Sequence, residues 1–143
     1  MGHNPLLNNH FQVEWGGNRL GFTEVTGLDM EINIVDFREG NSTETRFRRL
    51  PGLEKPGTVT LKRGILPGDN QFYEWMQTIR FNQAERRDVV ITLLNESHEP
   101  VMRWKLLKAW PSRLSGPWLK SDGNEVATET LELAHEGMVV ETI

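Results

Sequence analysis

Three arginines crowd into one short segment of the chain, where their side chains could bind phosphate or carboxylate groups. Arg46, Arg48 and Arg49 fall within residues 46–49. The planar guanidinium group makes bidentate contacts with either anion. Arginine beside leucine and proline also fits a protein interface, where charged and apolar contacts combine. The candidate interface residues of this segment are Glu44, Arg46, Arg48, Arg49, Leu50, Pro51, Leu53 and Lys55.

The charge of the whole chain favours a protein partner over a nucleic acid for this segment. The sequence holds 16 basic and 20 acidic residues and has a net charge of −4 at pH 7, so no general attraction to phosphate is expected. Glu44 and Glu54 dilute the local positive charge, and the nearest aromatic residue for base stacking is Phe47. We favour a protein interface, and a monomeric nucleic-acid-binding β module is the alternative.

The other residues that could do chemistry form no recognisable catalytic or metal-binding pattern. Asp29 and Glu31 would share one face of a strand and could work as an acid–base pair, but carboxylates usually mark a solvated face. The four histidines lack metal-ligand spacing, and the chain has no cysteine, no HExxH or GxSxG motif and no glycine-rich phosphate loop. We predict no catalytic residue, metal or cofactor; a hydrolase using Asp29 and Glu31 is a remote alternative.

Length and composition fit one folded domain over residues 1–143, with residues 1–9 as a flexible terminus. The hydrophobic fraction of 37% and the charged fraction of 25% are typical of a globular protein and not of a disordered one. No stretch reaches the ~18 apolar residues of a membrane helix, so we expect no membrane anchor. The first ten residues also lack the basic and apolar regions of a secretory signal.

The elements that must position these residues follow from the spacing of apolar side chains. Alternation predicts strands over 11–15, 30–34, 58–62, 102–106 and 126–133, and a continuous apolar run predicts a strand buried on both faces over 89–94. Helical spacing predicts one helix over about 69–83, with Asp69 as its N-cap. Pro51-Gly52 and Pro56-Gly57 predict an irregular loop before residue 58, and Pro111 predicts another over 111–117. The result is an antiparallel β sandwich or partly closed barrel flanked by a single helix.

Several segments together resemble the phage tail tube family, which includes the inner tube proteins of contractile injection systems. The resemblance runs from about residue 10 to residue 138. It rests on FQVEWGG (11–17), GFTEVTGL (21–28), LPGLEKPGTVTLKRGI (50–65), FYEWM (72–76), KAWPSRLSGPWL (108–119) and EVATETLELAHEGM (125–138). The segments LPG…KPGTVTLKRG (50–64) and ETLELAHEG (129–137) together are the most specific pieces.

The resemblance implies a structural subunit, not an enzyme, that assembles into stacked hexameric rings forming a hollow tube. It implies that sheets of six protomers join into the lumen wall and that residues 40–57 contact a neighbouring subunit and the adjacent ring. The implied partners are a sheath protein, baseplate and spike proteins, and DNA or an effector as cargo. The protein would be made in the bacterial cytoplasm and assembled in a phage tail or in an extracellular or cell-attached injection particle.

Two alternatives within the resemblance concern the role of the subunit. One is a tube protein of the hemolysin-coregulated type from type VI secretion, which shares the architecture. The other is a tube initiator close to the baseplate, present in few copies. Strand alternation alone assigns the polar side of residues 30–34, with Glu31 and Asn33, to the lumen.

Overall fold

Ten strands and one helix make up the described part of the chain. The computed structural model describes residues 5–15, 18–20 (backbone only), 22–38, 40, 47–55, 57–80 and 85–143, so the predicted interface residues Glu44 and Arg46 lie outside the described residues. The strands are β1 (Phe11–Trp15), β2 (Asn18–Leu20), β3 (Glu24–Thr26), β4 (Glu31–Phe37), β5 (Arg48–Lys55), β6 (Thr58–Gly64), β7 (Arg87–Leu94), β8 (Pro100–Ser115), β9 (Thr128–Ala134) and β10 (Gly137–Thr142). The helix α1 spans Gln71–Arg80.

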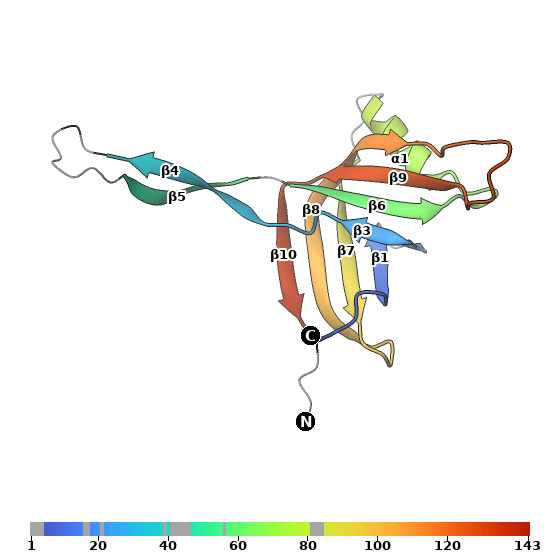
Figure 1. Ribbon diagram of the computed structural model, residues 1–143, viewed down its shortest axis with the longest axis horizontal. Coiled ribbons are helices and arrows are strands. Elements are labelled where there is room, and N and C mark those ends of the chain that lie inside the picture. The colour runs from blue at the N-terminus through green and yellow to red at the C-terminus, as the bar shows by residue number, and fades with distance from the viewer. Residues whose placement is uncertain are drawn as a thin grey trace.

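Strand β8 joins the two crossing layers of the body. Its first part pairs antiparallel with β7 on one side and β10 on the other, and its second part pairs with β9. The strand order is therefore β2-β1-β7-β8-β9-β6-β3, with β10 beside β8 (Figure 1). Lys108, with φ of 50°, lies where β8 changes partners, and its N–H donates to the Asp88 carboxylate at 3.1 Å. The layers form an antiparallel sheet structure that does not close into a barrel.

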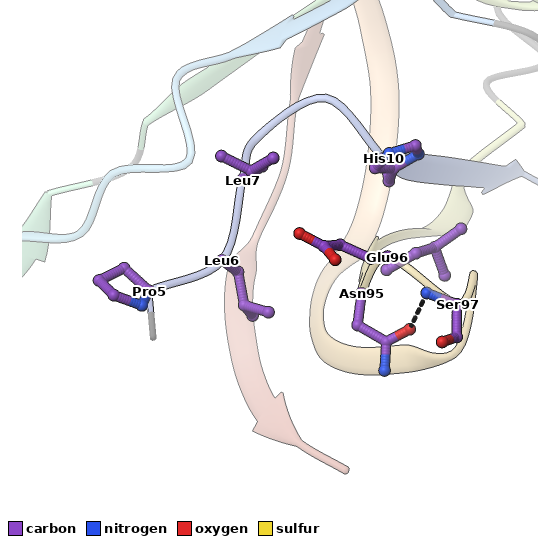
Figure 2. A pocket seen from close by; sticks show the side chains of 8 residues that line it. Pro5, Leu6, Leu7, His10, Asn95, Glu96 and Ser97 are labelled. Carbon is purple, nitrogen blue, oxygen red and sulfur yellow. Dashed lines mark hydrogen bonds between the residues drawn. The ribbon is translucent and has the colours of Figure 1, made fainter. Parts of the chain in front are cut away.

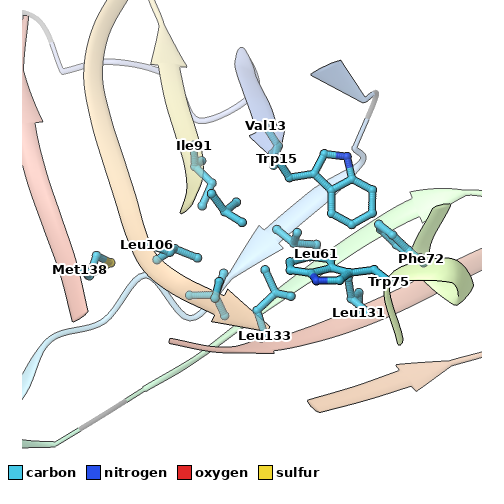
Figure 3. Close-up of a cluster of buried hydrophobic side chains, with 13 residues drawn as sticks. Val13, Trp15, Leu61, Phe72, Trp75, Ile91, Leu106, Leu131, Leu133 and Met138 are labelled. Atoms are coloured by element: carbon cyan, nitrogen blue, oxygen red, sulfur yellow. The ribbon is translucent and has the colours of Figure 1, made fainter. Parts of the chain in front are cut away.

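The core lies between these layers and under the helix. Alternate residues of each strand face inward, as Val59, Leu61 and Arg63 do on β6, because successive strand side chains point to opposite faces. Figure 3 shows the buried cluster. At its centre the Trp15 ring meets Phe72 and Trp75 edge-on, with ring centroids 5.1 and 4.9 Å apart, a favoured aromatic geometry. The strand alternation predicted from the sequence is confirmed for this core.

A buried arginine fixes the start of the helix against the sheet. The Arg63 guanidinium donates to Glu129 Oε1 at 2.7 Å and to both carboxylate oxygens of Asp69 at 3.0 and 3.1 Å, and it lies 4.1 Å from the centre of the Phe72 ring. Asp69 also accepts the Gln71 N–H at 3.2 Å, which caps the first turn of α1. The predicted capping role of Asp69 is confirmed, and the described helix ends at Arg80.

Strands β4 and β5 form a hairpin arm that projects away from the body (Figure 1). They pair only with each other, from Glu31↔Lys55 to Phe37↔Arg48, and the register shifts between Ile32 and Ile34. The arm is the most prominent departure of the molecule from a rounded shape. Residues 48–55 therefore belong to a regular element and not to a loop on the surface of the body.

Two sequence predictions about proline are wrong. Pro51 lies inside β5, where an irregular loop was predicted, and Pro111 lies inside β8, where a connection was predicted. Each proline lies beside a register shift, and proline is tolerated at bulges and edge strands because a ladder hydrogen bond is not required there. Gly52 suits the same place, since an added Cβ would lie 3.0 Å from the Asn33 carbonyl oxygen and 3.0 Å from Val35 Cγ2.

Candidate subunit-interface site

The arm brings together the described members of the predicted interface segment. Arg48, Arg49, Leu50, Pro51, Leu53 and Lys55 all lie on β5, and all are exposed. Glu31 and Asn33, which the sequence assigned to the lumen, lie on the facing strand β4 and are exposed as well. The arm therefore places both predicted sets on one ribbon.

The arm and the residues beside it expose many large apolar side chains to solvent. Its large exposed hydrophobic side chains include Met30, Ile32, Ile34, Val35, Phe37, Phe47, Leu50 and Leu53. Leu53 is 83% exposed. Contiguous exposed apolar groups mark interaction sites, and an isolated two-stranded hairpin is only marginally stable in water. The arm therefore has the chemistry of a surface that another molecule covers.

The charges on the arm are partly paired across the two strands. Arg49 Nε lies 3.6 Å from the Asp36 carboxylate, and Lys55 Nζ lies 3.7 Å from that of Glu31. Both pairs are well exposed, so each adds at most about 1 kcal/mol to stability. Arg48 forms no ion pair with any other described residue. Its guanidinium is thus available for a carboxylate of a partner.

Gly27 fixes the place where the chain leaves the body to enter the arm. Its φ is 87°, and a Cβ added to it would collide with the carbonyl oxygen of Thr58, the first residue of β6. Only glycine adopts this conformation without steric cost. The base of the arm therefore packs closely against the start of β6.

The acidic and histidine side chains of the described residues do not gather into a metal site. The described residues hold no cluster of three or more histidine, cysteine, aspartate or glutamate side chains that could bind a metal ion. Asp29 is exposed, and Glu31 pairs with Lys55, so the two carboxylates do not converge in a pocket. The described helix is not long and apolar enough to cross a membrane.

A pocket lies beside the N-terminal segment (Figure 2). It has a volume of about 280 Å³ and lies between residues 5–10 and the turn that joins β7 to β8. The Asn95 side chain is used to shape this turn, because its oxygen accepts the N–H groups of Ser97 and Glu99 at 2.9 Å. His10 packs edge-on against His98, with ring centroids 4.8 Å apart.

Two surfaces that the sequence did not single out as sites are prominent in the structure. One is a charged hollow of about 400 Å³, lined by Glu14, Val90, Thr92, Arg103, Lys105 and Glu141. It lies on the outer face of the first layer, which consists of β2, β1, β7, the first part of β8 and β10. The other is the β8–β9 loop, residues 116–127, with the exposed side chains of Trp118, Leu119 and Val126. Strand alternation could have indicated the first surface; nothing in the spacing of residues 116–127 indicates the second.

The fold is that of structural tube proteins. A chain in the extended sheath–tube complex of an extracellular contractile injection system, PVC, superposes with a TM-score of 0.90 at 26% identity, covering 99% of this chain and 94% of that one. A chain in the tube-terminating cap of the anti-feeding prophage, AFP, gives 0.91 at 29% identity, covering 100% and 95%. Hcp1 from Flavobacterium johnsoniae shares the fold with a TM-score of 0.58 at 13% identity, over 92% and 94%.

The sequence comparison identifies the family. Residues 7–139 match the family described as T4-like virus tail tube protein gp19, and the chain belongs to that family. No curated protein matches the chain at a significant level. The family predicted from the sequence motifs is confirmed, and so are the mainly β fold class and the relation to the Hcp fold.

Proposed function

We propose that this protein is the subunit of the inner tube of a contractile phage tail or contractile injection system. It assembles into hexameric rings that stack into a conduit for DNA or effector cargo. The observation that carries the proposal is the exposed apolar and basic arm on a chain that belongs to a tail tube family. A protruding arm that fits a different surface on the next copy produces repeating, heterologous contacts, which generate rings and stacks.

The arm supplies the contacts between copies in this proposal. A neighbouring subunit and the adjacent ring are contacted by the predicted interface residues, which are Glu44, Arg46, Arg48, Arg49, Leu50, Pro51, Leu53 and Lys55. Pairing of β4 with β5 shapes the ribbon before it binds, which lowers the entropy lost on association. The chain has 20 acidic residues that can offer carboxylates to the basic side chains of the arm.

The sheath protein, the baseplate and the spike are the remaining proposed partners. The similar chains come from a sheath–tube complex and from a tube-terminating cap, which supports a place inside such a particle. In this proposal the bacterial cytoplasm is the site of synthesis, and the finished tube acts in a phage tail or an extracellular or cell-attached particle. Contraction of the sheath drives the tube, so the subunit acts mechanically.

Two polar faces compete for the lumen of the proposed tube. The first is the side of β4 with Glu31 and Asn33; the second is the charged hollow on the outer face of the first layer, with Arg103 and Lys105. Single cysteines at Asn33 and at Lys105 separate them, since the chain has no cysteine of its own. The lumen position reacts more slowly with a bulky maleimide in tubes than in monomers, and equal rates in both forms exclude it.

Reversing the charge of the arm tests its role in assembly. We expect Arg48→Glu and Arg49→Glu to raise the protein concentration needed for assembly about tenfold or more, because like charges then face the acidic partner groups. Sedimentation velocity and negative-stain microscopy measure assembly, and circular dichroism confirms folding. Arg48→Lys and Arg49→Lys keep the charge and serve as matched controls. Unchanged assembly of both reversed variants would show that the arm is not the contact.

A further inference from the structure

The β8–β9 loop exposes a tryptophan side chain that packs in no core of this chain. Trp118 is 83% exposed and Leu119 is 78% exposed. The other four tryptophans are buried or half-buried. Val126, on the opposite limb of the loop, is also 78% exposed. Tryptophan is enriched among the residues that dominate binding energy at interfaces, so this cluster has the composition of a docking surface.

Contacts within the loop give this surface a defined shape. The Gly123 N–H donates to the Lys120 carbonyl at 3.0 Å and closes a turn. Lys120 Nζ lies 5.8 Å from the centre of the Trp118 ring and 3.9 Å from the Asp122 carboxylate. The two limbs enclose a hollow of about 360 Å³, lined on one side by Trp118 and Leu119 and on the other by Val126. The hollow is large enough to accept apolar side chains from another molecule.

The loop and the arm lie at opposite ends of the long axis of the molecule (Figure 1). The arm carries exposed apolar groups such as Ile34 and Leu53, and the loop carries exposed apolar groups of its own. Their charges are also complementary. The described arm offers Arg48, which has no described ion-pair partner, whereas the exposed acids of the loop are Asp122 and Glu125.

We propose that the β8–β9 loop is the surface on which the arm of a second copy of this chain docks. The inference rests on the proposed function and specifies its contact. A head-to-tail contact covers both apolar ends in every copy of a closed ring, and in every copy of an open stack except the two at its ends. Because the two surfaces differ, the contact repeats in one direction and either closes into a ring or continues as a stack.

Single-cysteine variants test this contact directly, since the chain has no native cysteine. Leu53→Cys marks the arm, Leu119→Cys marks the loop, and Ser97→Cys, on the exposed turn between β7 and β8, is the matched control. The variants are mixed in pairs under assembly conditions, treated with a short bis-maleimide, and run on a denaturing gel. Negative-stain microscopy of the same samples records whether rings or tubes have formed.

We expect a cross-linked dimer from Leu53→Cys mixed with Leu119→Cys, and at least about tenfold less from either variant alone or from Leu53→Cys mixed with Ser97→Cys. Rings or tubes without the arm–loop dimer would overturn this inference and leave the proposed function standing. Residue 119 that stays reactive in bare tubes and is protected only by added sheath protein would assign the loop to the sheath and also overturn it. Absence of rings and tubes under all conditions would overturn both proposals.

A second pair of variants tests how much the indole ring of Trp118 contributes to assembly. We expect Trp118→Ser to raise the concentration at which assembly begins about tenfold or more, because a central tryptophan commonly contributes that much to binding. Trp118→Phe keeps an aromatic side chain and should stay within about threefold of the native protein. Both substitutions fall on an exposed side chain, so both variants should fold. Equal assembly of Trp118→Ser and the native protein would contradict the inference.

Discussion

Arg63 is the side chain on which the junction of sheet and helix depends. It is buried, it contacts Glu129 on β9 and Asp69 before α1, and it covers the Phe72 ring. Burying a charge is costly unless hydrogen bonds and opposite charges compensate it. Here three hydrogen bonds and two carboxylates do so. One arginine therefore connects β6, β9 and the helix.

We expect Arg63→Ala to lower the free energy of unfolding by about 3–5 kcal/mol, because it leaves Glu129 and Asp69 without their partner and opens a cavity beside Phe72. Urea unfolding followed by tryptophan fluorescence measures the change. Lys62→Ala, at the adjacent position of β6 with a side chain that is not buried, should cost less than about 1 kcal/mol. A similar cost for the two variants would show that the network contributes little.

The acid side of the network predicts a pH dependence. Burial raises the pKa of Asp69, but the Gln71 N–H and the Arg63 guanidinium outweigh it, so the pKa of Asp69 lies below its usual value. A carboxylate with a lowered folded pKa stabilises the protein above its unfolded pKa, about 3.9, and loses this contribution as the pH falls through the folded value. Stability should therefore fall below about pH 4, and Asp69→Asn should flatten that part of the curve. Identical urea midpoint curves against pH for the two proteins would contradict this.

At the scale of the element, the arm shows what the sequence could and could not predict. Strands 11–15 and 58–62 were predicted because their alternation reflects one buried face, and strand 89–94 was predicted because its continuous apolar run reflects two. β5 was missed because it has no buried face and its proline is read as a breaker, whereas an exposed ribbon with a register shift accommodates Pro51. The strand near residues 30–34 was predicted, but its apolar face is exposed on the arm and not packed in the core. The spacing of apolar residues along a strand does not distinguish a face that packs inside one chain from a face that packs between two chains.

The base of the arm can be tested through its glycine. We expect Gly27→Ala to lower the free energy of unfolding by at least about 1–2 kcal/mol, since alanine is strained at positive φ and its Cβ would collide with Thr58. Gly68→Ala has a positive φ but no neighbour within 4 Å, and Gly116→Ala has neither constraint. The order of cost Gly27, Gly68, Gly116 in thermal unfolding is the expected result. An equal loss of stability in Gly27→Ala and Gly68→Ala would show that Thr58 moves away from the added Cβ at little cost.

At the scale of the whole molecule, the protein has a stable body and two ends that a single copy leaves uncovered. The body buries its aromatic core between crossing layers, while the arm and the β8–β9 loop, at opposite ends of the molecule (Figure 1), expose apolar side chains. The family could be predicted from motifs along the chain. The pairing of these two ends could not, because it depends on where the fold places residues that are far apart in the sequence.

In the proposed function, copies of this chain assemble through these ends into a tube. Negative-stain microscopy of the purified native protein over a wide range of concentrations, with sedimentation velocity on the same samples, measures this assembly. We expect rings with sixfold symmetry and, at higher concentration, stacks of rings with a central channel. A folded protein that remains monomeric at every concentration and forms no ring or tube would contradict it.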